Sequence, residues 1–516
     1  MPAPTQVPVT VSVGPLSIAE VVAVARNGAP VVINEAALAA MKESRAFVDE
    51  LASSGRAVYG VSTGFGALAT KYIDPEQRSR LQRSLGRSHA AGAGPCVETE
   101  VVRALMLLRL STLCTGRTGV RPSTAAAYAD CLNAQIAPCV PEFGSLGCSG
   151  DLAPLSHCAL AIMGEGEVFD ASGVRMPAAQ ALSAAGLAPV ELREKEGLAL
   201  INGTDGMLGT LCLAITDLRK LAKVADISAS MSIEALLGTD AVMVAELQAL
   251  RPQVGQAESA RNMCRLLHGS PIAESHRDED ARVQDAYSLR CAPQVAGGLR
   301  DTLAHAGTVA ERELASAIDN PVVLPDGRIE SNGNFHGAPV AYVLDFLAIV
   351  TADLASIAER RTDRMLDQCR SNGLPPFLAQ DPGVDSGHMI AQYTQAGIVS
   401  ELKRLANPAS VDSIPSSAMQ EDHVSMGWSA ARKLRRSVDG LAHVLAIEVL
   451  TAARAVELRS PHKPGPATGA VLARLREDIE GAGPDRWLSP EIRKAYELVI
   501  DGSVVAAAEA VLGELE

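Results

Sequence analysis

The sequence predicts a mainly α-helical protein, in which a smaller mixed N-terminal region precedes a bundle of long helices. Three observations favour this fold class. Aromatic residues make up only 3% of the 516 residues, and alanine and leucine are abundant, which favours helix over sheet. Apolar residues recur at steps of three and four over long stretches, which is the spacing of a buried helix face. The hydrophobic fraction of 47% is enough to fill a large core.

The N-terminal region is expected to mix helices, a short strand and loops. Helical spacing runs through residues 17–27, and "APVVIN" at 29–34 is typical of a short strand. Residues 35–55 show a strong helical pattern that a glycine closes. The glycine-rich stretch 58–70 predicts a loop, and helical spacing resumes over 75–135.

Long helices are expected to dominate from about residue 196 onward. The clearest apolar seam steps by four and three through Val343, Leu347, Val350, Leu354 and Ile357. A second seam spans 428–458, and a third spans 296–317 and stops near Pro321, which disfavours helix in the residue before it. We therefore expect three consecutive regions, namely an N-terminal region with two loops of interest, a central bundle, and a linker with short helices: 1–195, 196–460 and 461–516.

Composition excludes several classes of function. The formal net charge is -14, so nucleic acid and anionic membrane surfaces are poor partners. The apolar stretch 341–358 contains Asp345 and Asp353, which argues against a membrane span, and no signal peptide is recognisable at the N-terminus. The ten cysteines show no CxxC pair and no framework spacing, so we expect reduced, mostly buried thiols in a cytoplasmic protein.

The stretch "GSLGCSGDLAPLSH" (144–157) contains a triplet, Cys148-Ser149-Gly150, in a loop poor in side chains. If the Gly150 nitrogen meets the Cys148 carbonyl carbon, a five-membered imidazolone closes, and loss of the Ser149 hydroxyl as water leaves an exocyclic methylene. Such a group is an electrophile made from the chain itself. Asp151 is placed to orient the loop or to assist dehydration. A plain turn is the other interpretation of these residues.

Eight segments, in this order, extend the motif over most of the chain. They are "YGVSTGFG" (59–66), "LQRSLGRSHAAGAG" (81–94), "GSLGCSGDLAPLSH" (144–157), "EGLALINGT" (196–204), "VQDAYSLRCAPQV" (283–295), "AIDNPVV" (317–323), "NGNFHGAPVA" (332–341) and "SVDSIPSSAMQEDHVSM" (410–426). With them the chain resembles the histidine and phenylalanine ammonia-lyase family, the aromatic amino acid lyases and aminomutases. The resemblance implies the ammonia-lyase fold, a 4-methylidene-imidazol-5-one group formed from Cys148, Ser149 and Gly150, and no metal or dissociable cofactor. It also implies an amino acid substrate and a homotetramer whose active sites share residues of three subunits.

The same resemblance assigns catalytic roles to matched positions. Tyr59 matches the loop tyrosine taken as the general base, which needs cationic neighbours or a helix dipole because a free phenol has a pKa near 10. Asn202 and Tyr287 match residues that polarise or protonate at the prosthetic group and the reaction centre. Phe335 matches the aromatic side chain beside the methylidene group. Structural roles, such as core capping, a satisfied hydrogen bond or plain packing, are the alternatives for each.

Further positions match the substrate-binding residues of the family. Arg290 matches the guanidinium that pairs with the substrate carboxylate, and its planar fork suits that task. Gln284 matches a polar residue of the same pocket. The pair Ser88-His89 resembles the histidine enzymes rather than the phenylalanine or tyrosine enzymes, and so does Glu421, since a carboxylate pairs well with an imidazole. Core packing or a structural ion pair is the alternative for these side chains. The expected reaction removes the α-amino group and a β-proton from L-histidine, giving urocanate and ammonia.

Several departures from the family pattern leave the substrate open. Cys148 replaces the usual alanine, Asp205 stands for glutamine, His388 for an apolar aromatic residue, Met419 for asparagine, and Gly337 lies in "NFHGAP" where "NFHAEP" is usual. An alternative substrate is therefore a modified histidine, such as the betaine ergothioneine, or another aromatic amino acid, with either a lyase or an aminomutase outcome. A catalytically silent relative with a structural or binding role is a different class, which is disfavoured because five residues are retained together: Tyr59, Ser149, Asn202, Tyr287 and Arg290. The fumarase–aspartase group shares a helical bundle, but its serine loop is missing here.

Overall fold

The computed structural model describes residues 7–54, 62–64, 71–147, 150–277 and 282–516. The chain forms two compact units that interleave along the sequence. Unit 1 comprises Met1–Leu213, Gly307–Asp345 and Pro408–Arg432, and unit 2 comprises Ala214–Ala306, Phe346–Asn407 and Lys433–Glu516. The mainly helical fold class that the sequence predicts is confirmed. The three consecutive regions stay a prediction of chain organisation, and the compact units follow a different division.

Unit 1 contains the shorter helices and all the strands of the described residues. Its helices are α1 (Ile18–Ala25), α2 (Glu35–Ser53), α3 (Arg78–His89), α4 (Thr99–Cys114), α5 (Pro122–Asn133), α6 (Leu152–Ile162), α7 (Ala178–Ala184) and α8 (Glu196–Ala199). Its strands are β1 (Val9–Val11), β2 (Val31–Ile33), β3 (Ala93–Cys96), β4 (Ala137–Pro138), β5 (Pro141–Phe143), β6 (Glu167–Phe169), β7 (Arg175–Pro177), β8 (Val322–Val323) and β9 (Ile329–Glu330).

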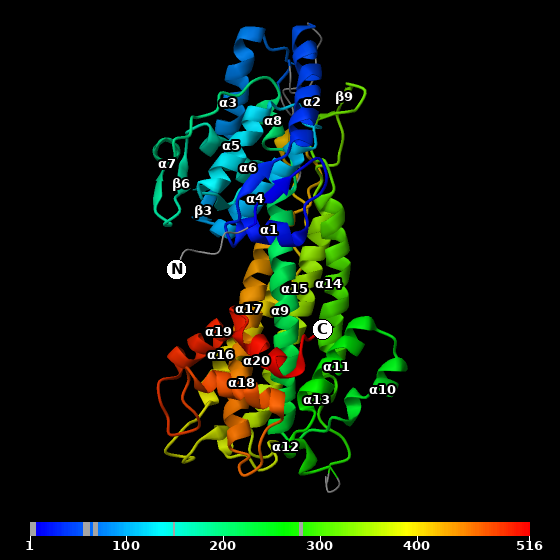
Figure 1. The fold of residues 1–516 in the computed structure, drawn as a ribbon, viewed down its shortest axis with the longest axis vertical. Helices are drawn as coiled ribbons and strands as arrows, with labels where there is room; N and C mark the ends of the chain where they lie inside the picture. Colours follow the sequence, from blue (N-terminus) through cyan, green and yellow to red (C-terminus); the bar gives the residue numbers. More distant parts are fainter. Residues whose placement is uncertain (1–6, 55–61, 65–70, 148–149, 278–281) are drawn as a thin grey trace. The chain divides into compact units, whose positions relative to one another are not determined.

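Helix α4 forms the centre of unit 1. Helices α1, α2, α5 and α6 pack against it (Figure 1), and its residues from Val101 to Cys114 are all buried. The strands make only small sheets at the margin: β1 pairs with β2 in parallel, while β3–β5, β4–β6–β7 and β8–β9 are antiparallel. The helix expected over 17–27 begins at Ile18, where Ser17 and Glu20 form a capping box. The strand expected at 29–34 is β2.

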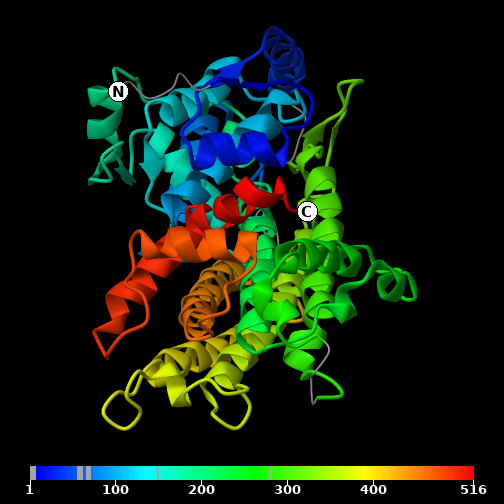
Figure 2. The ribbon, with the colours of Figure 1, turned by 60° about the horizontal axis from the view of Figure 1, so that its bottom comes forward.

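Unit 2 contains the shorter helices of the second half of the chain. They are α10 (Ala245–Ala249), α11 (Val254–Leu267), α12 (Pro271–Glu274), α13 (Tyr287–Arg290), α16 (Met389–Leu405), α18 (Pro466–Arg476), α19 (Leu488–Ile500) and α20 (Ser503–Leu512). The C-terminal helices, coloured orange to red in Figure 2, are structured rather than a loose tail: α20 packs against α18, α19 and α11.

Four long helices contribute residues to both units: α9 (Asp205–Ala235), α14 (Ala292–Leu314), α15 (Ala338–Leu366) and α17 (Gly427–Glu457). Three of them are the apolar seams that the sequence predicts. On α15, Val343, Leu347 and Leu354 are buried, as expected for a seam, whereas Val350 and Ile357 are only half-buried.

Helix α15 is the one helix among the described residues that is long and apolar enough to cross a membrane. Its mean hydropathy is 1.8 over the most apolar window, but 61% of that window is buried inside the structure. Asp345 within it is buried and accepts a hydrogen bond from the Ser410 backbone N–H at 2.7 Å. These features are those of a core helix, so the helix is weak evidence for a membrane span.

Candidate active site

Gly150, the last residue of the predicted triplet, has a backbone conformation that only unit 1's close packing around a glycine allows. Gly150 has a φ of 73°, and a Cβ at this position would overlap the carbonyl of Gly203. Only glycine is therefore compatible with this backbone. Gly147, on the other side of the triplet, is held by a hydrogen bond, because the Ser425 hydroxyl donates to the Gly147 carbonyl at 2.9 Å. Of the predicted triplet, Cys148 and Ser149 lie outside the described residues, as does Tyr59.

Asp151, the residue after the triplet, is fully buried and joins the loop to the start of α9. Its Oδ2 accepts hydrogen bonds from the backbone N–H groups of Gly206 and Met207, each at 2.9 Å, and its Oδ1 accepts one from the Ser145 hydroxyl at 3.0 Å. The carboxylate thus satisfies N–H groups that a helix start leaves without intrahelical partners. Burial raises the pKa of Asp151 to about 7, although the hydrogen bonds from Met207 and Ser145 oppose this.

Asn202 lies just before α9, in a buried polar cluster. Its side-chain amide donates to the carbonyls of Leu198 at 3.2 Å and Asn320 at 3.4 Å. Arg109, which is fully buried, donates to the Asn202 backbone carbonyl and fixes this segment from the other side. The structure therefore anchors Asn202 firmly, as its structural interpretation requires, and its role in polarising the prosthetic group stays a prediction.

Asp205, one of the departures from the family pattern, has a cationic partner within unit 1, the side chain of Arg109. Its carboxylate lies 3.5 Å from the Arg109 guanidinium, and both side chains are buried. Burial raises the pKa of Asp205, while the charge of Arg109 lowers it. Because the new carboxylate has a cationic partner, its presence at the head of α9 requires no contact with a substrate.

His89 ends α3, and Ser88 precedes it. The His89 Nδ1 lies 3.1 Å from the Leu85 carbonyl and 3.0 Å from the Ser88 hydroxyl. A carbonyl can only accept, so the proton of a neutral ring belongs on Nδ1, which leaves Nε2 as the acceptor nitrogen. Burial lowers the pKa of His89, while the Leu85 carbonyl and the charge of Glu421 raise it. The influence of Glu421 on this pKa indicates that the two residues of the predicted imidazole site lie within range of an electrostatic interaction.

Phe335 and Glu421 lie on two segments that contact each other through histidines. The rings of His336 and His423 stack with centroids 5.3 Å apart, and the Nδ1 of His423 lies 3.3 Å from the Nε2 of His336. Phe335 is half-buried, and Glu421 accepts a hydrogen bond from the Ser416 hydroxyl at 3.0 Å.

The remaining predicted residues belong to unit 2. Gln284 and Arg290 line a cavity of about 420 Å³, together with Arg277 and Arg282. Two of the three arginines are already paired, because Arg277 binds Asp240 and Glu274 and Arg282 binds Asp285: these ion pairs measure 3.1, 2.9 and 3.1 Å.

Arg290 differs from the other two arginines of this cavity. Its buried Nε has no hydrogen-bond partner among the described residues. Its guanidinium lies over the ring of Tyr287, 4.7 Å from the ring centroid, and Tyr287 is 71% exposed. A guanidinium that is stacked on an aromatic ring, and whose Nε has no acceptor among the described residues, is suited to bind an incoming carboxylate.

Two further departures, His388 and Met419, have structural surroundings of their own. His388 is buried at the start of α16, with Nδ1 3.1 Å from the Thr451 hydroxyl, and burial together with the charge of Arg454 lowers its pKa to about 3. Its ring is therefore neutral at physiological pH. Met419 has a φ of 69°, and its side chain is 68% exposed. Asparagine adopts this left-handed conformation more readily than methionine.

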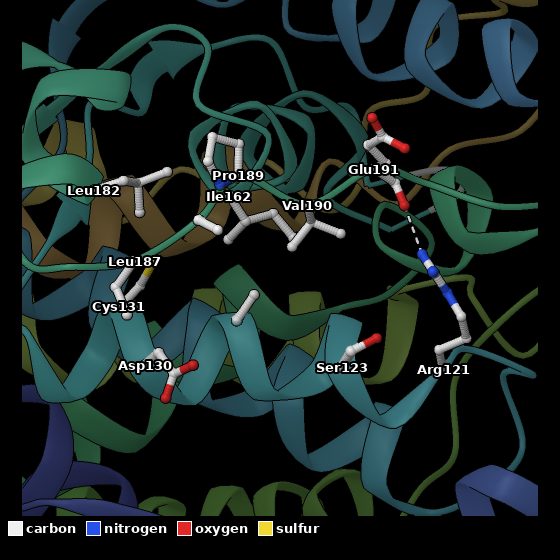
Figure 3. Close-up of a pocket in the computed structure, with 12 residues that line it drawn as sticks. Arg121, Ser123, Asp130, Cys131, Ile162, Leu182, Leu187, Pro189, Val190 and Glu191 are labelled. Carbon is white, nitrogen blue, oxygen red and sulfur yellow. Dashed lines mark hydrogen bonds between the residues drawn. The ribbon is translucent and has the colours of Figure 1, made fainter.

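A second cavity, of about 360 Å³, lies in unit 1, and none of the predicted site residues line it. Figure 3 shows apolar side chains among those that line it, including Ile162, Leu182 and Val190, and shows that Arg121 points to the Glu191 backbone carbonyl, to which it donates at 2.5 Å. Arg121 also forms an ion pair with Glu196 at 2.7 Å. Because its cation is already satisfied, this cavity is not the candidate active site.

The comparisons with known proteins agree with the geometry. The model of the aromatic amino acid lyase family matches residues 16–477. The chain belongs to this family. It is 65% identical to a histidine ammonia-lyase of Streptomyces coelicolor over 508 residues, which cover 98% of this chain and 99% of the relative.

Solved structures of family members have the same fold. A tyrosine aminomutase from Streptomyces globisporus superposes with a TM-score of 0.93 at 37% identity, covering 99% of this chain and 100% of that one. A histidine ammonia-lyase from Trypanosoma cruzi gives a TM-score of 0.91 at 36% identity, covering 98% and 96%. An ergothionase from Treponema denticola gives 0.90 at 28% identity, covering 97% and 100%.

The described residues fit the prosthetic group that the aromatic amino acid lyase family implies. The backbone at Gly150 leaves no room for a side chain. Because glycine has none, the Gly150 nitrogen is not shielded by a side chain of the same residue. The Gly147 carbonyl accepts a hydrogen bond from Ser425. The Asp151 carboxylate accepts hydrogen bonds from two backbone N–H groups at the start of α9. Within these limits, the residues that would form and hold the group are Cys148, Ser149, Gly150 and Asp151.

Sequence reasoning missed the buried charges that support the site. Arg361 and Glu448 form an ion pair at 2.5 Å in which both side chains are buried. A signal was present in the sequence, since Arg361 continues the apolar seam of α15 four residues after Ile357, and Glu448 interrupts the apolar run "HVLAIEVL". A charge at a seam position indicates a buried partner, but the sequence does not say which one.

Proposed function

We propose that this chain is a histidine ammonia-lyase, which converts L-histidine to urocanate and ammonia. The observation that carries the proposal is the 65% identity to a histidine ammonia-lyase over 98% of this chain. Two features of the site support it. These are a histidine of unit 1 whose pKa is lowered by burial and raised by the charge of Glu421, and an arginine without a hydrogen-bond acceptor for its Nε among the described residues of unit 2.

The His89 and Glu421 pair suits an imidazole substrate. The Nε2 of neutral His89 is an acceptor for a ring N–H, while a carboxylate accepts an N–H or pairs with a charged ring. A phenyl side chain offers no N–H to either of these half-buried groups, so phenylalanine would leave both without a partner on the substrate, which disfavours it. Ser88 contributes by sharing the Nδ1 proton of His89, at 3.0 Å, which fixes the ring orientation.

The reaction breaks the Cα–N bond and a Cβ–H bond of histidine and forms a carbon–carbon double bond. The methylidene-imidazolone group, where it forms from Cys148, Ser149 and Gly150, supplies an electrophile toward the substrate amine, which otherwise leaves poorly. Arg290 would bind the carboxylate of the substrate and orient it. Tyr59 and Tyr287 remain the predicted residues for proton transfer, and Asn202, Gln284 and Phe335 the predicted residues around the reacting atoms.

Histidine is better supported than the alternative substrates. The ergothionase is only 28% identical to this chain, against 65% for the histidine ammonia-lyase. Of the departures that suggested a modified substrate, Asp205 is paired with Arg109 and His388 is buried against Thr451. Both changes are therefore explained by partners inside the protein.

A homotetramer in the cytoplasm completes the proposal. Helix α15 presents Tyr342, Phe346 and Ile349 at steps of four and three, and these side chains are 58%, 49% and 41% exposed. An apolar stripe of this kind on a long helix supports helix contacts between subunits. The nine cysteines among the described residues are free thiols, which supports a reducing compartment.

The test is elimination by the purified full-length chain, followed through urocanate absorbance and ammonia release with histidine, phenylalanine and tyrosine in parallel. We expect both signals with histidine alone. His89→Gln should raise KM for histidine about 10-fold or more because a polar contact to the substrate ring is lost, whereas His268→Gln, at an exposed position, should leave KM unchanged. Release of ammonia from phenylalanine but not from histidine would overturn the proposal.

A further inference from the structure

A buried polar network in unit 2 ends at the short helix that carries Tyr287 and Arg290. At its centre, Glu448 of α17 accepts four hydrogen bonds. Ser228 and Ser232, one turn apart on α9, donate at 2.7 and 2.8 Å, and the Arg361 guanidinium of α15 donates through Nε at 2.5 Å and Nη2 at 3.0 Å. Both oxygens of the carboxylate are thereby satisfied, and the guanidinium is held in one orientation.

The third nitrogen of the Arg361 guanidinium does not contact Glu448 but donates to α13. Its Nη1 donates to the backbone carbonyl of Ser288 at 3.3 Å. Ser288 lies between Tyr287 and Arg290 in a helix of four residues. A single helical turn has little stability of its own, because nucleation fixes several residues for very few hydrogen bonds. The orientation of this turn therefore depends on contacts from outside it.

We propose that Arg361 is a positioning residue that sets the orientation of α13, and with it the guanidinium of Arg290, through the Ser288 carbonyl. The inference rests on the proposed function, in which Arg290 binds the substrate carboxylate. Arg361 does not touch the substrate. Through Glu448 and the two serines, Arg361 is fixed to three long helices, α9, α15 and α17. Its hydrogen bond to the Ser288 carbonyl connects them to the short turn that carries two predicted site residues.

The decisive variant is Arg361→Lys. A lysine keeps the positive charge beside Glu448, but its single ammonium group cannot reproduce the planar fork that binds Glu448 and the Ser288 carbonyl together. The matched control is Arg300→Lys in the same unit. The Arg300 side chain is largely buried, at 8% exposed, and forms an ion pair with Asp226 at 2.6 Å, while its other hydrogen bonds go to Ser259 and Glu516 rather than to α13. Both variants remove one buried guanidinium and keep its charge.

Three measurements on the full-length protein separate positioning from general destabilisation. KM and kcat for histidine are compared with inhibition by histamine, which has the imidazole and amine but no carboxylate, and by imidazole propionate, which has the carboxylate. Amide hydrogen exchange is followed in the peptide that covers residues 284–295. Thermal midpoints report the loss of stability in each variant.

We expect Arg361→Lys to raise KM for histidine and the inhibition constant of imidazole propionate about 10-fold or more, since small displacements of a binding group have large effects. The inhibition constant of histamine should stay unchanged, and exchange in 284–295 should rise. Arg300→Lys should lower the thermal midpoint without these selective effects. Equal weakening of both inhibitors, or unchanged exchange in 284–295, would overturn the inference.

Hydrogen exchange does not depend on catalytic activity. Failure of the proposed function can therefore be distinguished from failure of the positioning role of Arg361. If the wild-type protein does not act on histidine, the proposed function fails, while altered exchange at α13 still reports positioning by Arg361. If Arg361→Lys does not fold, Glu448→Gln keeps the hydrogen-bonding shape and weakens the hold on Arg361. It should then give the same selective pattern at a smaller size.

Discussion

Asp151 is expected to stabilise the start of α9 by accepting hydrogen bonds, and not by its charge. Replacement by asparagine keeps an oxygen that can accept from the N–H groups of Gly206 and Met207, and an amide that can donate to the Ser145 hydroxyl. Replacement by alanine removes every one of these partners. Comparing Asp151→Ala with Asp151→Asn therefore isolates the hydrogen bonds, because neither variant carries a charge at this position.

The size of the difference follows from the contacts. Alanine leaves two buried backbone N–H groups, each now bound at 2.9 Å, without an acceptor. A buried donor left unsatisfied costs about 1–3 kcal/mol, and loss of a helix-capping side chain costs about 0.5–2 kcal/mol when measured as a whole. We expect Asp151→Ala to be less stable than Asp151→Asn by about 2–5 kcal/mol.

Thermal and urea unfolding of the two variants at equal protein concentration measure this difference. Asp170 supplies a matched control, since its carboxylate also accepts from two backbone N–H groups and one hydroxyl, at 2.9, 2.9 and 2.7 Å, but at a solvent-exposed turn. There, water replaces the lost acceptor, so Asp170→Ala and Asp170→Asn should differ much less. Equal unfolding midpoints for Asp151→Ala and Asp151→Asn would refute the reasoning.

Three further predictions follow from burial and backbone geometry. Burial raises the pKa of Asp151 to about 7 from an ordinary value of 3.8, so its contribution to stability is full below pH 4 and is lost as the pH rises through 7; the thermal midpoint of the wild type relative to Asp151→Asn should therefore fall between about pH 4 and pH 7, and a constant difference would contradict this sign. Gly150→Ala should abolish ammonia release and the near-ultraviolet absorbance of the prosthetic group, because its Cβ would overlap the Gly203 carbonyl; retained absorbance would show that the loop has room. Burial raises the pKa of the Cys131 thiol to about 12, so iodoacetamide at pH 8 should alkylate the exposed Cys369 and leave Cys131 unmodified, as peptide mass spectrometry would show.

Sequence periodicity predicted the helices because it is a local property. The apolar steps of four and three along α15 require only the residues of that segment, and the capping box at Ser17 requires only its neighbours four residues or fewer away. The triplet around Ser149 and the segments around it likewise identify the family, since a reaction on the backbone needs particular residue types at fixed spacing. Of the predicted site, the structure brings His89 and Glu421 within range of an electrostatic interaction, and places Gln284 and Arg290 around one cavity.

The partners of buried charges depend on packing between segments that are distant in sequence, and only the tertiary structure decided them. Asp151 caps α9 through residues 55 and 56 positions away, and Arg361 finds Glu448 at a separation of 87 residues. The sequence showed that such charges needed partners, because an unpaired charge is costly in a core. It determined the helices, the family and the residue types of the chemistry, while the choice of partners followed from which helix faces meet when those helices pack.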